Sequence, residues 1–191
     1  MHHRLRFRQR LKAETANSLT HGVGVGLSMA ATAILLAKAV TSGGVLRITS
    51  AAIYGACMIL VFLSSAAYHS MMQPRARRLF LVLDHSSIFL AIAGTYTPLS
   101  LVLLHGPLGW KLFTAVWSLA LAGIFFKTLY IDCFDFLSMF IYVLLGWMVL
   151  FVIRSLSAAM HNDGFVLFFG TACTSYPCTC TCSNYRQERT A

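Results

Sequence analysis

Five long apolar segments dominate the sequence and limit its fold more than any other feature. They span residues 21–40, 45–68, 79–104, 110–131 and 137–153. A helix rises about 1.5 Å per residue, so about 20 residues cross a hydrocarbon core of about 30 Å. The segments lack the alternating polar pattern of a β-barrel. The sequence therefore predicts an all-α fold, a polytopic transmembrane helix bundle with five spans. A sixth apolar segment, 164–176, has only 13 residues and is a short sixth candidate whose crossing of the membrane the sequence does not decide.

Composition supports a membrane protein and excludes other classes. Hydrophobic residues make up 58% of the 191 residues and charged residues 11%, against about 45–50% and about 25% in soluble domains. A disordered protein, a nucleic-acid-binding domain and most soluble enzymes are therefore excluded. The net charge of +9 comes mostly from Lys and Arg between apolar segments, where cations set membrane orientation. The expected partner is a lipid bilayer and not nucleic acid.

The basic residues predict a cytoplasmic N-terminus. With this orientation nine basic residues lie inside and four lie outside: Arg4, Arg6, Arg8, Arg10, Lys12, Arg75, Arg77, Arg78 and Lys127, against Lys38, Arg47, Lys111 and Arg154. An excess of Lys and Arg marks cytoplasmic loops. We therefore expect a multi-pass protein of the cell (inner) membrane, with its N-terminus in the cytoplasm.

The sequence divides into three parts. Residues 1–20 form a basic cytoplasmic segment, 21–163 the transmembrane bundle, and 164–191 an atypical Cys- and Thr-rich segment. The loops within the bundle are short and contain turn residues, as in Thr41-Ser42-Gly43-Gly44, which indicates antiparallel neighbouring helices. Pro98 lies inside the third span and is expected to kink it. Gly22 and Gly26 are expected to let another helix pack closely.

Polar residues gather at the predicted cytoplasmic ends of the first three spans. Glu14, Asn17 and His21 precede or begin the first span, Ser65 and His69 end the second, and Asp84 and His85 begin the third. Antiparallel spans place these ends at one depth near the inner leaflet.

Helical spacing brings several of these residues onto common faces. At about 100° per residue, Glu14, Asn17 and His21 fall within an arc of about 60°. Ser65 and His69 share a face, whereas the adjacent Asp84 and His85 diverge by about 100°. Imidazoles with a carboxylate are ligands for zinc. The alternative is structural: such groups can reach the lipid headgroups or hydrogen-bond between helices.

Three motifs carry a family resemblance. Glu14-Thr-Ala-Asn17-Ser-Leu-Thr20-His21, Ser65-Ala-Ala-Tyr68-His69 and Leu83-Asp84-His85-Ser86 occur in this order. They resemble the signatures of the hemolysin III family, which is grouped with the progestin and adipoQ receptors and is related to the alkaline ceramidases. The resemblance covers about residues 10–155 and includes the pair Gly146-Trp147.

The resemblance implies a seven-helix bundle with an intramembrane zinc near the cytoplasmic side. By the match His69 is a zinc ligand, and Asp84 acts on the metal through a water that it orients. Ser65 supports the site or contacts a substrate. The family's other ligands are two His of a His-x-x-x-His motif in the last helix.

The C-terminal part departs from this pattern, since the last histidine is His161 and no His-x-x-x-His follows. The sequence thus resembles a truncated seven-helix bundle, and an active hydrolase would be impaired by the two missing ligands. His21, His85 and Glu14 are the available substitutes. The abrupt change of composition suggests a frameshift or truncation, which translation of the other reading frames would test. The tail's four cysteines are candidate soft-metal ligands or residues of an unstructured tail: Cys173, Cys178, Cys180 and Cys182.

Three functions remain at this stage. The resemblance favours a hemolysin III-type membrane protein that perturbs membranes, that is, a cytolytic activity. The clustered His, Asp and Ser favour a zinc-dependent lipid amide hydrolase, in which zinc would activate water and polarise the scissile carbonyl of a lipid substrate. A non-enzymatic receptor or signalling bundle is the third.

Overall fold

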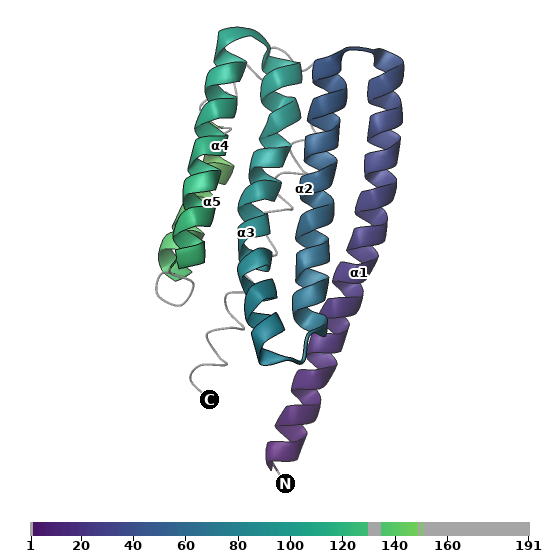
Figure 1. Cartoon of the computed structure of the whole chain (residues 1–191), viewed down its shortest axis with the longest axis vertical. Coiled ribbons are helices and arrows are strands. Elements are labelled where there is room, and N and C mark those ends of the chain that lie inside the picture. The colour runs from purple at the N-terminus through teal and green to yellow at the C-terminus, as the bar shows by residue number, and fades with distance from the viewer. Residues whose placement is uncertain (1, 130–134, 149, 151–191) are drawn as a thin grey trace.

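A computed structural model describes residues 2–129, 135–148 and 150 (Figure 1). Six helical elements follow one another along this part of the chain: α1 (His2–Ser42), α2 (Val45–Ser70), α3 (Pro74–Pro98), the π-helix η1 (Leu99–Leu104), α4 (Gly106–Leu129) and α5 (Asp135–Trp147). The predicted polytopic helical bundle is confirmed.

Four of the described helical segments are long and apolar enough to cross a membrane: Leu11–Ser42, Val45–Ser70, Pro74–Leu104 and Gly106–Leu129. The first helix is longer than its predicted span, because α1 continues N-terminally from residue 21 to His2. The expected fifth span is represented by α5, which has 13 residues. The rest of that span lies outside the described residues, apart from Met148 and Leu150. The short segment 164–176 and the tail cysteines lie wholly outside them.

Glycine and proline set the boundaries of the first turns. Gly43 and Gly44 adopt φ angles of 70° and 96°, a region that favours glycine, and they separate α1 from α2. Pro74 occupies the first turn of α3, where its missing N–H leaves no helical hydrogen bond unmade. These tight turns make α1, α2 and α3 antiparallel neighbours, as Figure 1 shows.

Helix α3 is the central helix of the described bundle. It contacts α2, α4 and α5. In the segment Pro74–Leu104, which comprises α3 and η1, 67% of the most apolar 18-residue stretch is buried, compared with 6% in Leu11–Ser42 of α1. The apolar side chains of α1 instead point outward, among them Leu19, Leu27 and Ile34. In a membrane protein such a surface faces lipid, so α1 packs mainly against α2 and leaves its other side to the bilayer.

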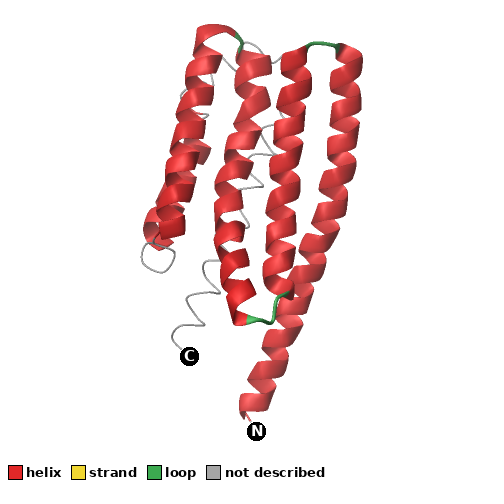
Figure 2. Cartoon of the chain, in the orientation of Figure 1, coloured by secondary structure: helices red, strands yellow, loops and turns green. Residues whose placement is uncertain are grey.

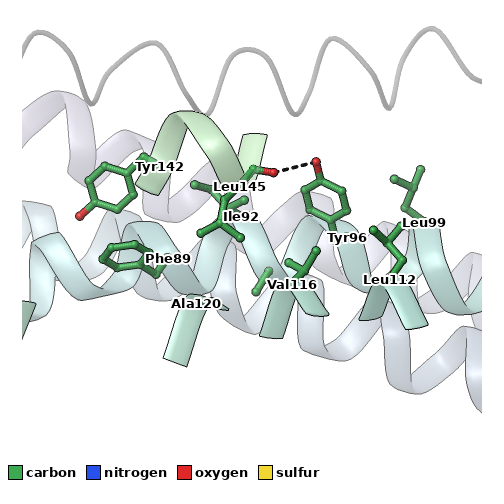
Figure 3. Packing of buried hydrophobic residues seen from close by; sticks show 10 residues of the cluster. Phe89, Ile92, Tyr96, Leu99, Leu112, Val116, Ala120, Tyr142 and Leu145 are labelled. Carbon is green, nitrogen blue, oxygen red and sulfur yellow. Dashed lines mark hydrogen bonds between the residues drawn. The ribbon is translucent and has the colours of Figure 1, made fainter. Parts of the chain in front are cut away.

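The core lies where α3 meets α4 and α5 (Figure 3). Phe89 and Tyr142 pack with ring centroids 4.3 Å apart, and Val116 and Leu145 are completely buried beside them. Tyr96 donates its hydroxyl hydrogen to the carbonyls of Leu145 and Gly146, at 2.9 and 3.0 Å. A buried phenol needs such a partner in a lipid-facing fold, and this one joins α3 to α5.

The helix changes type after Pro98. Residues Leu99–Leu104 continue α3 as a π-helix, one of the backbone adjustments that follow a proline in a membrane helix. Neighbouring hydroxyls bond back to the helix: Thr97 donates to the Ala93 carbonyl at 3.0 Å and Ser100 to the Tyr96 carbonyl at 2.7 Å. The structure thus shows a change in hydrogen-bond register after Pro98, whereas the expected kink stays a prediction.

The close-packing glycines differ from those expected. Nothing in the described structure lies within 4 Å of a side chain added at Gly22 or Gly26, so the prediction of a packing face there is wrong for this part of the chain. Gly24 instead packs against Phe62, and Gly109 packs against the backbone carbonyl of Ser100. The spacing of the glycines could not show which side of α1 contacts α2, because that depends on the rotation of α1 about its axis.

Gly109 gives a test of this packing. A Gly109→Ala substitution should lower the free energy of unfolding by about 1–3 kcal/mol, because its methyl group would collide with the Ser100 carbonyl. Gly22→Ala is the matched control and should be neutral or slightly stabilising, since the site is open and alanine favours helix. Unfolding titrations in detergent measure both. Equal effects of the two substitutions would contradict the described contact between α4 and η1.

Candidate functional site

Polar side chains of α1, α2 and α3 meet at the end of the bundle that contains the α2–α3 loop. This loop lies at the lower end of the bundle in Figure 2. Helix α1 passes this loop and extends beyond it toward the N-terminus. We call the group the polar cluster; it consists of Glu14, Ser18 and His21 of α1, Ser65, Tyr68 and His69 of α2, and Arg77 and Asp84 of α3.

Glu14 connects the three helices. One oxygen of its carboxylate, Oε2, lies 2.6 Å from Nδ1 of His69 on α2. The other oxygen, Oε1, accepts a hydrogen bond from Nη2 of Arg77 on α3, at 2.5 Å. The side chain of His69 is 9% exposed and that of Glu14 is 20% exposed, so both groups are largely withdrawn from solvent. Their pairing offsets the cost of placing charge in an apolar span.

Arg77 is itself held by Tyr68. The guanidinium carbon lies 5.0 Å from the centre of the Tyr68 ring, a cation–π geometry. Nη2 also lies 3.5 Å from the Tyr68 hydroxyl oxygen. Tyr68 is buried and its ring meets that of His69 edge-on, with centroids 5.0 Å apart. The arginine is therefore fixed between a carboxylate and an aromatic face.

His21 lies next to His69. The two imidazole rings are stacked, with centroids 5.9 Å apart and planes 14° from parallel. One turn earlier on α1, the Ser18 hydroxyl donates to the Ala66 carbonyl at 3.3 Å. These contacts align α1 and α2 so that the two imidazoles face each other.

Asp84 occupies the α3 side of the polar cluster and is buried. Ser65, His21, His69 and His85 all lie near enough to interact with its carboxylate. About one turn further along α3, the Ser87 hydroxyl is hydrogen-bonded to the Ser64 hydroxyl of α2, at 2.9 Å. The Ser65, His69 and Asp84 side chains are thus brought together from two helices.

His85 and Asn17, also singled out in the sequence, make hydrogen bonds to residues outside the polar cluster. Nδ1 of His85 lies 2.9 Å from the Leu81 carbonyl of its own helix, and the His85 carbonyl accepts a hydrogen bond from Tyr142 on α5, at 2.9 Å. Asn17 accepts from the Thr20 hydroxyl through its backbone carbonyl, at 2.9 Å. Asp84 and His85 diverge as their adjacent positions require.

From the sequence, Arg77 was predicted only as one of the cations that set the orientation in the membrane, and not as a residue of the site. Its spacing could have indicated a place in the site, because Arg77 precedes Asp84 by seven residues and so shares a face of α3 with it. Ser18 likewise lies between Glu14 and His21 at helical spacing. Tyr68 could not be assigned from spacing, since its role depends on where Arg77 lies.

The donor set is suited to zinc chemistry but is incomplete within the described residues. His69 has its Nδ1 beside Glu14, which leaves Nε2 for a ligand, and Asp84 supplies a buried carboxylate. Catalytic zinc usually has three protein ligands. No group of three or more His, Cys, Asp or Glu arranged to hold a metal ion occurs in the part of the chain that the structure describes.

Comparison with known proteins identifies the family. A family model described as "Haemolysin-III related" matches residues 9–179. The chain belongs to this family. Among the described residues, the match covers the four segments that are long and apolar enough to cross a membrane, and it includes the whole polar cluster.

Two relatives bear the family's name. A "Hemolysin-3" of Bacillus cereus is 41% identical over 162 residues, which cover 85% of this chain and 74% of that protein. A "Hemolysin-3 homolog" of Bacillus subtilis (strain 168) is 42% identical over 159 residues, covering 83% of this chain and 75% of that protein. No solved structure matches the chain significantly.

Proposed function

We propose that this chain is a hemolysin III-type protein that perturbs the bilayer in which it is embedded. The observation that carries the proposal is its similarity to the "Hemolysin-3" of Bacillus cereus over 85% of the chain. The long exposed apolar surface of α1 supports action from within a membrane and not as a water-soluble toxin. Its partner is then the lipid bilayer itself.

The proposed location is the cell (inner) membrane with the N-terminus in the cytoplasm. The basic residues near the N-terminus and Arg75, Arg77 and Arg78 in the first turn of α3 or just beyond it support this orientation. The polar cluster would then lie at the depth of the inner leaflet.

Leakage from vesicles tests the proposed activity. Vesicles that contain the purified protein and an entrapped dye should release the dye faster as the protein-to-lipid ratio rises. A polytopic helical membrane protein of similar size, reconstituted at the same ratio, is the control for non-specific leakage. Equal release from both kinds of vesicle would contradict a membrane-perturbing function.

The second candidate is a zinc-dependent lipid amide hydrolase. It is supported by the convergence of Ser65, His69 and Asp84, with His21 beside them. In this proposal Nε2 of His69 would bind zinc, which would activate water and polarise the carbonyl of the lipid amide. Asp84 would orient the attacking water and accept its proton, and Ser65 would hold the Asp84 carboxylate in place. The ligands beyond His69 stay unassigned.

Metal content tests this candidate. The purified protein should contain zinc, and His69→Ala should lose it. His105→Ala should retain it, because His105 is an exposed histidine between η1 and α4. Zinc content is measured for all three proteins with the four tail cysteines replaced by serine, so that the tail cannot bind the metal. These are Cys173, Cys178, Cys180 and Cys182. Protein without zinc before the histidine substitutions would contradict the hydrolase, and zinc retained in His69→Ala would contradict the assignment of this ligand.

A further inference from the structure

Each carboxylate oxygen of Glu14 lies within hydrogen-bond distance of a nitrogen, and the two nitrogens belong to different helices. Oε1 pairs with Arg77 and Oε2 lies 2.6 Å from Nδ1 of His69. Glu14 is far from both in sequence, by 55 and 63 residues. This geometry determines which nitrogen of His69 carries the hydrogen.

An ionised carboxylate can only accept hydrogen bonds, and a guanidinium can only donate them. The pairing with Arg77 favours the ionised form of Glu14, because a charged partner at hydrogen-bond distance stabilises the negative charge. Nδ1 of His69 must then be the donor to Oε2. A neutral imidazole has one N–H, so its Nε2 carries the free lone pair.

The surrounding contacts hold this arrangement in place. Tyr68 lies under the Arg77 guanidinium at 5.0 Å and limits its movement away from Glu14. The His21 ring stacks on the His69 ring and limits its rotation. The imidazole is therefore fixed both by its Nδ1 hydrogen bond and by the ring beside it.

We propose that Glu14 is a positioning residue for His69. It keeps the ring in the tautomer with hydrogen on Nδ1 and leaves the Nε2 lone pair for the ligand of the site, while Arg77, packed on Tyr68, holds the Glu14 carboxylate. A carboxylate bonded to the far nitrogen of a histidine ligand commonly orients the ring and raises its basicity. The use of the free Nε2 rests on the proposed zinc hydrolase, but the tautomer itself does not.

Nitrogen NMR of histidine-labelled protein in lipid nanodiscs, with a chelator and at a pH of about 8, tests the tautomer directly. His69→Gln identifies the His69 signals. In the unsubstituted protein Nδ1 should be protonated and Nε2 should not. Protonation of Nε2 in the unsubstituted protein, either alone or together with Nδ1, would overturn the proposal without any further variant.

Glu14→Ala should shift His69 toward the tautomer with hydrogen on Nε2, because Nδ1 loses its acceptor. Thr15→Ala is the matched control: Thr15 is the next residue of α1, its hydroxyl bonds to Leu11 of the same helix at 2.8 Å, and its loss should leave the His69 signals unchanged. Glu14→Gln, which preserves side-chain size, should give a mixture, since an amide can donate as well as accept. Unchanged His69 signals in both Glu14 variants would contradict the positioning role.

A zinc titration separates this inference from the proposed enzyme. Removal of a group that orients a metal ligand lowers affinity by about 10–100-fold, so Glu14→Ala should bind zinc that much more weakly than Thr15→Ala. Zinc bound equally by both variants would contradict the positioning role, even if the hydrolase is correct. The expected tautomers in a protein that binds no zinc would refute the hydrolase and leave the role of Glu14 intact.

Discussion

The pairing of polar groups inside an apolar fold is the constraint on which the rest of this structure depends. In a membrane helix a charge or a buried donor without a partner is costly, because no water is present to replace the partner. Glu14 meets this requirement through His69 and Arg77. Since the three residues belong to three helices, the same pairing sets how far α1 is displaced along α2 and α3.

Helix α3 has such polar contacts at several points along its length. At one end Arg77 and Asp84 take part in the polar cluster, further along Ser87 bonds to Ser64 of α2, and beyond it Thr97 accepts a hydrogen bond from Trp117 of α4 at 3.1 Å. The apolar core around Phe89 fills the space between these contacts. Polar contacts thus select the neighbours of α3, and close packing at Gly109 and Gly123 brings α4 near.

Much of the fold followed from the sequence, because span length and loop chemistry are local properties. The apolar segments predicted the helices, and the turn residues between them predicted antiparallel neighbours. The start of α1 at His2 was missed, since polar residues can continue a helix beyond the membrane as readily as they can end it. The glycine faces were also missed, because the side of α1 that meets α2 depends on rotation about the helix axis.

The candidate site was predicted only in part, because the sequence gives the depth of a residue but not the direction of its side chain. Motif order and depth brought Glu14, His69 and Asp84 to one end of the bundle, but depth alone cannot say which side chains touch. Arg77 was interpreted only as a cation that sets the membrane orientation, although its ion pair with Glu14 favours the charged form of that carboxylate. Contacts between helices depend on rotation and tilt, which a single sequence does not contain.

A double-mutant cycle between Glu14 and Arg77 tests the central claim that charges of separate helices meet in this end of the bundle. Unfolding free energies are compared for the unsubstituted protein, Glu14→Gln, Arg77→Gln and the double variant, with Arg75→Gln, an exposed neighbour on α3, as the control partner. A direct pair should give a coupling energy of about 0.5–2 kcal/mol, and Glu14 with Arg75 should be additive. Additive effects for Glu14 and Arg77 within about 0.3 kcal/mol would contradict the described arrangement.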